Sequence, residues 1–268
     1  MKIKQYIYLI CALLATCSPL GSVSDALAKS STEKSAKKTP VKTTTIAKKS
    51  SASKVASRKI IPIKRYVPEP EKFSALVVDA DTGKVLYEKN AGNLRYPASL
   101  TKMMTLYLTF EALKKGQLKM DQTLVVSAKA ASQPQTNLSL EPGDRVPVRT
   151  IIESLVVRSA NDSAMTVAEA LGGTQWNFAL MMTKKARQLG MKNTVFKNPN
   201  GLPDNGQHTT AFDMARLGIA LRRDFPEYFP YFKTERFDFN GVTYTTHNRV
   251  MLRYGGADGI KTGYIRAS

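Results

Sequence analysis

A helix that is apolar around its whole circumference constrains the fold of this 268-residue chain more than any other feature. Pro97 precedes the segment 99–115 and Gly116 follows it, so both ends carry helix boundary signals. Its apolar side chains fall on most faces of the helix: Leu100, Met103, Met104, Leu106, Tyr107, Leu108 and Phe110. Because a helix that is apolar on all sides is a buried one, we expect other elements to pack around it.

Ser99 and Lys102 stand in the first turn of this helix and share one face, because they are three residues apart. A lysine there opposes the helix dipole, where a purely structural sequence would favour Asp or Glu. Both this position and burial lower the pKa of a lysine amine, and a neutral amine can act as a general base. Three other Ser-x-x-Lys spacings lie before residue 55, in a polar stretch without apolar periodicity. The pair at 99 and 102 therefore predicts a serine nucleophile activated by a lysine.

Two further short motifs follow along the chain. Ser159 and Asn161 belong to a Ser-Ala-Asn tripeptide, and Lys261 begins the only Lys-Thr-Gly in the sequence. A second serine can relay a proton to a leaving group, and a cationic strand edge can hold a substrate carboxylate. In this order, the three motifs predict an acyl-transfer site in a cleft where they meet.

Hydrophobic periodicity and turn signals predict strands at both ends of the domain and helices between them. The expected strands cover residues 73–79, 84–89, 235–240, 242–247 and 259–264, and the expected helices cover 99–115, 147–157, 162–171, 174–189 and 211–223. This order indicates an α/β (α+β) fold, with a mainly antiparallel sheet built from both ends, flanking helices and a helical subdomain.

The first 72 residues differ in composition from the rest. Residues 1–28 have the pattern of a signal peptide: a positive start, an apolar run over 6–17 too short for a comfortable membrane span, and a small-residue cleavage pattern. An uncleaved membrane anchor is the alternative. Residues 29–72 are rich in Lys, Ser, Thr and Ala and predict a disordered basic linker. Residues 73–268 would then form the catalytic domain.

Charge and cysteine content limit the partners and cofactors. Residues 1–72 carry 15 Lys or Arg against 4 Asp or Glu, more than half of the net charge of +19. This basic stretch could contact an anionic membrane or wall polymer, although a soluble tether is the simpler interpretation. Nucleic acid is not expected, because export separates the chain from it. Both cysteines lie within the signal and only two histidines exist, so we expect no metal and no cofactor.

On these motifs, the chain resembles the low-molecular-mass penicillin-binding proteins, which are serine-type D-alanyl-D-alanine carboxypeptidases. The resemblance covers roughly residues 73–268 and extends to Tyr-Pro-Ala at 96–98, Asn-Pro-Asn-Gly-Leu at 198–202 and Asp-Met-Ala at 213–215. It implies a β-lactamase/transpeptidase-like fold. It also implies removal of the terminal D-alanine from peptidoglycan stem peptides that end in D-Ala-D-Ala. β-Lactams would inhibit because they mimic that end.

The resemblance also implies roles for individual residues. Ser99 would form the acyl-enzyme, Lys102 would be the base, and Ser159 would pass a proton to the departing D-alanine.

The remaining motif residues would bind substrate. Asn161 would orient the substrate amide and Lys102, while Lys261 and Thr262 would hold the terminal carboxylate. Gly263 would let the substrate backbone lie close. The backbone N–H of Tyr264 would join that of Ser99 in an oxyanion hole.

The family continues beyond Lys-Thr-Gly with a further strand and a closing helix, which this sequence lacks. We therefore expect this chain alone to be unstable or poorly active. Three rival functions remain open: a class A β-lactamase, a peptidoglycan endopeptidase and a wall-binding module without catalysis. The lactamase is disfavoured because Ala160 replaces the usual Asp, and because Glu169 lies on the helix after the middle motif, where it could not activate water.

Overall fold

A computed structural model describes residues 73–265. The proposed signal peptide at 1–28 and linker at 29–72 lie outside the described residues. Within the described part, none of the helices combines the length and apolar character needed to cross a bilayer.

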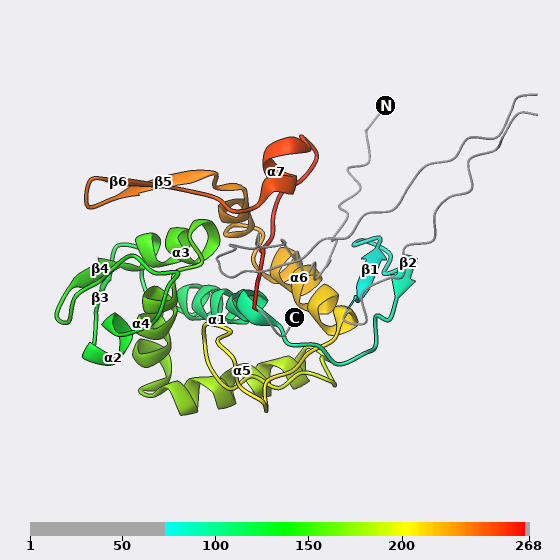
Figure 1. Ribbon diagram of the computed structural model, residues 1–268, viewed down its shortest axis with the longest axis horizontal. Coiled ribbons are helices and arrows are strands. Elements are labelled where there is room, and N and C mark those ends of the chain that lie inside the picture. Colours follow the sequence, from blue (N-terminus) through cyan, green and yellow to red (C-terminus); the bar gives the residue numbers. More distant parts are fainter. Residues whose placement is uncertain (1–72, 266–268) are drawn as a thin grey trace, which may run out of the picture. The chain divides into compact units, whose positions relative to one another are not determined.

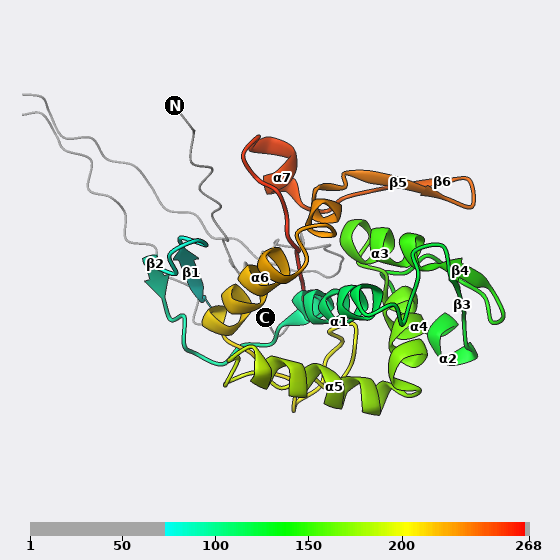
Figure 2. The ribbon, with the colours of Figure 1, turned by 180° about the vertical axis from the view of Figure 1, so that it is seen from behind.

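The buried helix is at the centre of the helical part of the domain. The chain enters it through a short 3₁₀ turn, η1 (Ala98–Thr101), and continues as α1 (Lys102–Lys114). Four helices pack around α1 (Figures 1 and 2): α3 (Val148–Val157), α4 (Asn161–Gly172), α5 (Gln175–Gln188) and α6 (Ala211–Asp224). This arrangement confirms the expectation drawn from its all-round apolar surface.

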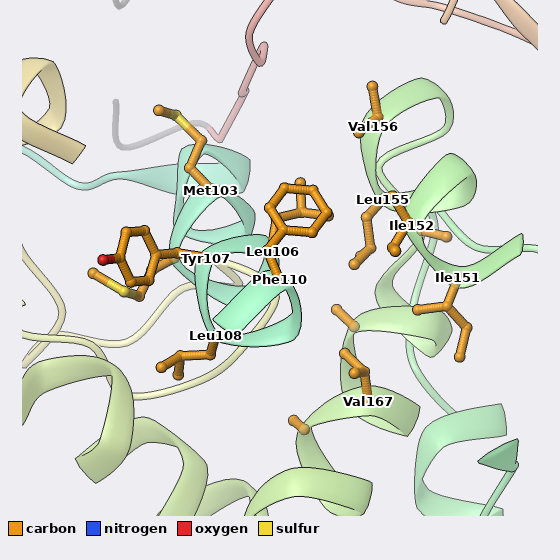
Figure 3. Close-up of a cluster of buried hydrophobic side chains, with 14 of the residues drawn as sticks. Met103, Leu106, Tyr107, Leu108, Phe110, Ile151, Ile152, Leu155, Val156 and Val167 are labelled. Carbon is orange, nitrogen blue, oxygen red and sulfur yellow. The ribbon is translucent and has the colours of Figure 1, made fainter. Parts of the chain in front are cut away.

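Packing of α1 supplies much of the core. Figure 3 shows Leu106 and Phe110 of α1 beside Ile152 and Leu155 of α3, and all four side chains are fully buried. Burial of one such side chain contributes about 1.5–3 kcal/mol. Gly116 ends the helix with a φ of +70°, and Gln117 N–H returns to the carbonyl of Ala112 at 2.9 Å. The first turn of α1 is therefore held on a rigid support.

The strands form three separate antiparallel pairs. The first joins β1 (Ala75–Val78) to β2 (Val85–Lys89), and the third joins β5 (Arg236–Phe239) to β6 (Val242–Thr245). Both hairpins were predicted, and Asn240 and Gly241 turn the second with φ angles of +47° and +74°. Antiparallel pairing is confirmed, but within 73–265 the two hairpins do not join in one sheet.

The shorter elements were not predicted. They include the second strand pair and three brief helical segments: β3 (Thr123–Val125), β4 (Arg145–Pro147), α2 (Ala128–Ala131), η2 (Phe229–Lys233) and α7 (Arg249–Arg253). Runs of three to five residues carry too little periodicity to be recognised from sequence.

The strand predicted over 259–264 is wrong, because these residues have no regular secondary structure. A strand needs a hydrogen-bonded neighbour, and within 73–265 no strand pairs with this segment. It is instead held by other contacts: Asn248 donates its side-chain amide to the carbonyl of Gly259 at 3.1 Å, and Ile260 is buried. In Figures 1 and 2 this red segment runs from α7 to the N-terminal end of α1.

Candidate active site

Ser99 and Lys102 are brought together by the turn that opens α1. The Lys102 amine lies 3.3 Å from Ser99 Oγ, as the three-residue spacing predicted. Ala98, immediately before the serine, has a φ of +46°, a conformation that L-residues adopt at a cost of about 1–3 kcal/mol. Such strain persists only where surrounding packing holds it, and here it fixes the direction of Ser99.

Lys102 is fully buried, with all its polar contacts inside the site. Its Nζ donates to Asn161 Oδ1 at 2.7 Å and to the backbone carbonyl of Asn200 at 2.6 Å, besides its contact with Ser99. A neutral amine has two N–H groups and one lone pair. If the two hydrogens serve the two short contacts, the lone pair faces Ser99 Oγ, ready to accept the hydroxyl proton.

Electrostatics favour that neutral form. Burial lowers the pKa of Lys102 well below its ordinary value, and the nearby positive charge of Lys261 lowers it further, against an opposing effect of Asp162. Burial likewise lowers the pKa of Lys261, to about 7. The two amines can therefore serve different purposes: burial favours the neutral form of Lys102, which accepts a proton, and Lys261 is partly charged near pH 7.

The middle motif is fixed by the loop that precedes β4. Asn161, the first residue of α4, donates its backbone N–H to the carbonyl of Thr136 at 2.7 Å and its side-chain amide to Pro134 O at 2.8 Å. Thr136 Oγ1 donates to Ser159 O at 2.9 Å. Ser159 has a φ of +62°, and its buried Oγ has no hydrogen-bond partner within residues 73–265. A buried hydroxyl without a partner costs about 1–3 kcal/mol, so it is a candidate for contact with a ligand.

Asp162 holds that loop in place. Its buried carboxylate accepts N–H groups of Leu138 at 2.9 Å and Leu140 at 3.2 Å, and the N–H of Ser163 in its own helix at 2.8 Å. Burial raises the pKa of Asp162, and the three N–H donors oppose this rise. Asp162 therefore anchors the segment that positions Asn161.

The segment 198–202 supplies contacts that the sequence alone did not assign. Besides the Asn200 carbonyl, Thr105 Oγ1 of α1 donates to Pro199 O at 2.6 Å, and Asn200 donates its side-chain amide to Gln133 Oε1 at 2.8 Å. Gly201 has a φ of +85°, and a Cβ there would lie 1.8 Å from the carbonyl oxygen of Ala98. The Asn-Pro-Asn-Gly run was the only sequence signal for this close approach.

The third motif lies against the nucleophile. A Cβ at Gly263 would lie 3.2 Å from Ser99 N and 3.3 Å from Leu100 N, so this glycine allows close approach to the start of α1. Lys261 is half-buried and donates to its neighbour's carbonyl, Thr262 O, at 2.8 Å. Residues of all three motifs therefore converge on Ser99 and Lys102. Tyr264 follows with its side chain exposed.

Glu169 is placed as the sequence indicated. It accepts a hydrogen bond from Ser127 Oγ at 2.6 Å near the start of α2, and it makes no contact with the serine–lysine pair. Within the described part of the chain, no group of three or more His, Cys, Asp or Glu side chains is arranged to hold a metal ion.

The two shifted amines predict a bell-shaped pH dependence for acylation. Raising the pH deprotonates Lys102 and increases the rate, because only the neutral amine accepts the serine proton. Raising the pH through about 7 removes the charge of Lys261 and weakens binding of the substrate carboxylate. We expect Lys261→Arg to remove the descending limb of kcat/KM, since arginine stays charged. A descending limb that survives unchanged in this variant would assign it to another group.

One protein family covers most of the chain: the family described as D-alanyl-D-alanine carboxypeptidase matches residues 64–268. The chain belongs to this family. D-alanyl-D-alanine carboxypeptidase DacF of Bacillus subtilis is 39% identical over 199 residues, which cover 72% of this chain and 51% of that protein. The chain thus spans about half the length of the curated relatives it matches.

Solved structures of a carboxypeptidase and of a penicillin-binding protein share the fold. The D-alanyl-D-alanine carboxypeptidase DacD of Francisella tularensis aligns with a TM-score of 0.70 at 29% identity, covering 79% of this chain and 64% of that one. Penicillin-binding protein D2 of Listeria monocytogenes in its ampicillin-bound form aligns with a TM-score of 0.62 at 28% identity, covering 73% and 80%. The predicted α+β fold of the penicillin-binding proteins is therefore confirmed.

Proposed function

We propose that the protein is a serine-type D-alanyl-D-alanine carboxypeptidase that shortens peptidoglycan stem peptides through an acyl-enzyme on Ser99. The observation that carries this proposal is the buried Lys102 amine, which has two short hydrogen bonds and Ser99 Oγ as its third neighbour. A buried lysine without a carboxylate partner adds no ion pair to the fold, whereas a general base needs this environment. Family membership supports the same reaction.

Acylation follows from this geometry. Neutral Lys102 takes the proton of Ser99 Oγ as the oxygen attacks the carbonyl of the penultimate D-alanine. The backbone N–H groups of Ser99 and Tyr264 stabilise the negative oxygen. As the peptide C–N bond breaks, Ser159 Oγ, which has no partner of its own within residues 73–265, gives its proton to the departing D-alanine amine and takes back the proton held by Lys102. Water then releases the shortened peptide from Ser99.

Substrate binding uses the remaining motif residues. Lys261 and Thr262 hold the terminal carboxylate, and Gly263, as the resemblance implies, lets the peptide backbone lie close. Asn161 orients both Lys102 and the substrate amide. β-Lactams enter the same site and acylate Ser99 because they mimic the D-Ala-D-Ala end.

The protein acts outside the cytoplasmic membrane in this proposal. The signal-like pattern at 1–28 supports export to the periplasm or cell envelope, where peptidoglycan lies. The basic stretch at 29–72 supports a weak contact with an anionic membrane or wall polymer.

D-Alanine release from a peptide ending in D-Ala-D-Ala tests the proposal. The wild-type chain should release D-alanine above background, at the low rate expected of this chain alone, and Ser99→Ala should reduce release to background. Ser132→Ala, which alters an exposed serine at the end of α2, is the matched control and should keep full release. No release by the folded wild-type chain, together with cleavage of cross-linked peptides, would assign the endopeptidase reaction instead.

A further inference from the structure

Arg158 stands next to the middle motif and has no part in the mechanism above. It is the C-cap residue of α3 and directly precedes Ser159. Its guanidinium reaches two segments across the site: the carbon Cζ lies 5.8 Å from the ring centroid of Tyr244 on β6, and two nitrogens lie 3.5 Å from Asn137 O and Gln135 Oε1. Arg158 therefore lies where the hairpin β5–β6 and the loop before β4 meet beside the motif.

The hydrogen-bonding capacity of Arg158 is largely unused. A guanidinium has five N–H donors in a planar fork, and the two contacts that Arg158 makes are both at the long limit for a hydrogen bond. Within residues 73–265, no carboxylate forms an ion pair with it. The planar fork of arginine matches a carboxylate in two-point contact.

The surroundings of Arg158 are cationic. His247, just beyond β6, has a pKa lowered first by burial and then by the positive charges of Arg158 and Lys261. The charges of Arg158 and Lys261 are therefore both close enough to affect His247. A region with these positive charges, in which no carboxylate of residues 73–265 pairs with Arg158, attracts a ligand that carries more than one negative group.

We propose that Arg158 is a specificity-determining residue that binds a carboxylate on the acyl portion of the substrate. This inference rests on the proposed carboxypeptidase function. The leaving D-alanine has a single carboxylate, which Lys261 and Thr262 take. A second carboxylate would therefore belong to the acyl side, and the first residue there with a side chain that can carry one is the residue before the two D-alanines. Arg158 would select donors with an acidic side chain there over donors with a neutral one.

Two matched peptides test this selection. They differ only in a side-chain carboxylate or its amide at the residue before D-Ala-D-Ala. In the wild-type chain, kcat/KM should favour the acidic donor by about 10-fold or more, as one charge-assisted hydrogen-bonded contact allows. Arg158→Gln should bring this ratio near one, and Arg158→Lys should retain part of it. Arg236→Gln, which removes an exposed charge from the β5–β6 hairpin that Arg158 contacts, should leave the ratio unchanged.

The outcomes separate a failed inference from a failed function. If the wild-type chain cleaves both peptides equally, or if its preference survives in Arg158→Gln, Arg158 does not select the substrate. If Arg158→Gln lowers kcat/KM equally for both peptides, Arg158 binds the shared terminal carboxylate or has a packing role. This result would also overturn the inference. If neither peptide releases D-alanine, the proposed function fails. The role of Arg158 is then decided with two penicillins that differ only in a side-chain carboxylate. Their acylation rates are compared as a ratio, in the wild-type chain and in Arg158→Gln.

Discussion

Lys102→Met should reduce the rate of acylation by a penicillin at least about 10³-fold in a protein that is still folded. Methionine fills nearly the same volume in the buried site but has no lone pair that can take the Ser99 proton. The amine contacts with Asn161 and Asn200 are lost, but the variant no longer buries a titratable group. Stopped-flow or quenched acylation, with near-ultraviolet circular dichroism to check packing, measures both properties.

Lys185→Met provides the control for this substitution. Lys185 is a largely buried lysine of α5, but it pairs with Glu111 at 2.8 Å on the far part of α1. Its loss should lower stability and leave acylation unchanged. If Lys102→Met still acylated within about 10-fold of the wild-type rate, Lys102 could not be the general base.

Gly201→Ala should disrupt the site through a steric clash. The added Cβ would lie 1.8 Å from the Ala98 carbonyl oxygen and 2.4 Å from its carbon, and backbone atoms cannot rotate away as a side chain can. Either Ser99 or the Asn200 carbonyl must move, so the serine–lysine geometry is lost. We expect a loss of about 3 kcal/mol or more in unfolding free energy and at least about 10²-fold in acylation rate.

Gly116→Ala separates this clash from backbone strain. Gly116 also has a left-handed φ, +70° against +85° at Gly201, but a Cβ there would have no neighbour within 4 Å. It should cost only about 1–2 kcal/mol, as strain alone does, with acylation preserved. Equal effects of the two substitutions in urea unfolding and acylation would show that the close approach to Ala98 has no special importance.

The parts of the site that lie on one helix could be predicted from the sequence. The helical repeat fixes the Ser99–Lys102 geometry, and the all-round apolar surface of α1 implies that Lys102 is buried. Contacts through backbone atoms could not be predicted in this way. The carbonyl of Asn200 serves Lys102 whatever its side chain, and it depends on a loop 98 residues away along the chain.

The third motif illustrates a second limit of sequence reasoning. We predicted a strand over 259–264, yet Ile260 is buried and Gly263 lies against Ser99 without any strand pairing in the described residues. A pattern of side chains indicates which faces are buried but not which neighbour supplies the hydrogen bonds. The resemblance implied that Gly263 lets the substrate backbone lie close, and its close approach to the backbone of Ser99 was not predicted.

Several locally unfavourable features gather at the site. They are the buried amine of Lys102, the unpartnered hydroxyl of Ser159 and the left-handed backbone of Ala98 and Ser159. Each costs free energy that the packed core around α1 offsets. Such a concentration of exceptions at one place is expected of a catalytic centre rather than of a structural surface.

The most direct test of the account is to identify the residue that a penicillin acylates. Intact mass spectrometry should show one adduct with the full mass of the β-lactam, because ring opening releases no atom. Trypsin should then place it on the peptide 96–102, which contains Ser99, and fragmentation should assign it to that serine. An adduct on the peptide 159–184, which contains Ser159, or no adduct on the folded protein, would contradict the assignment of Ser99 as the nucleophile.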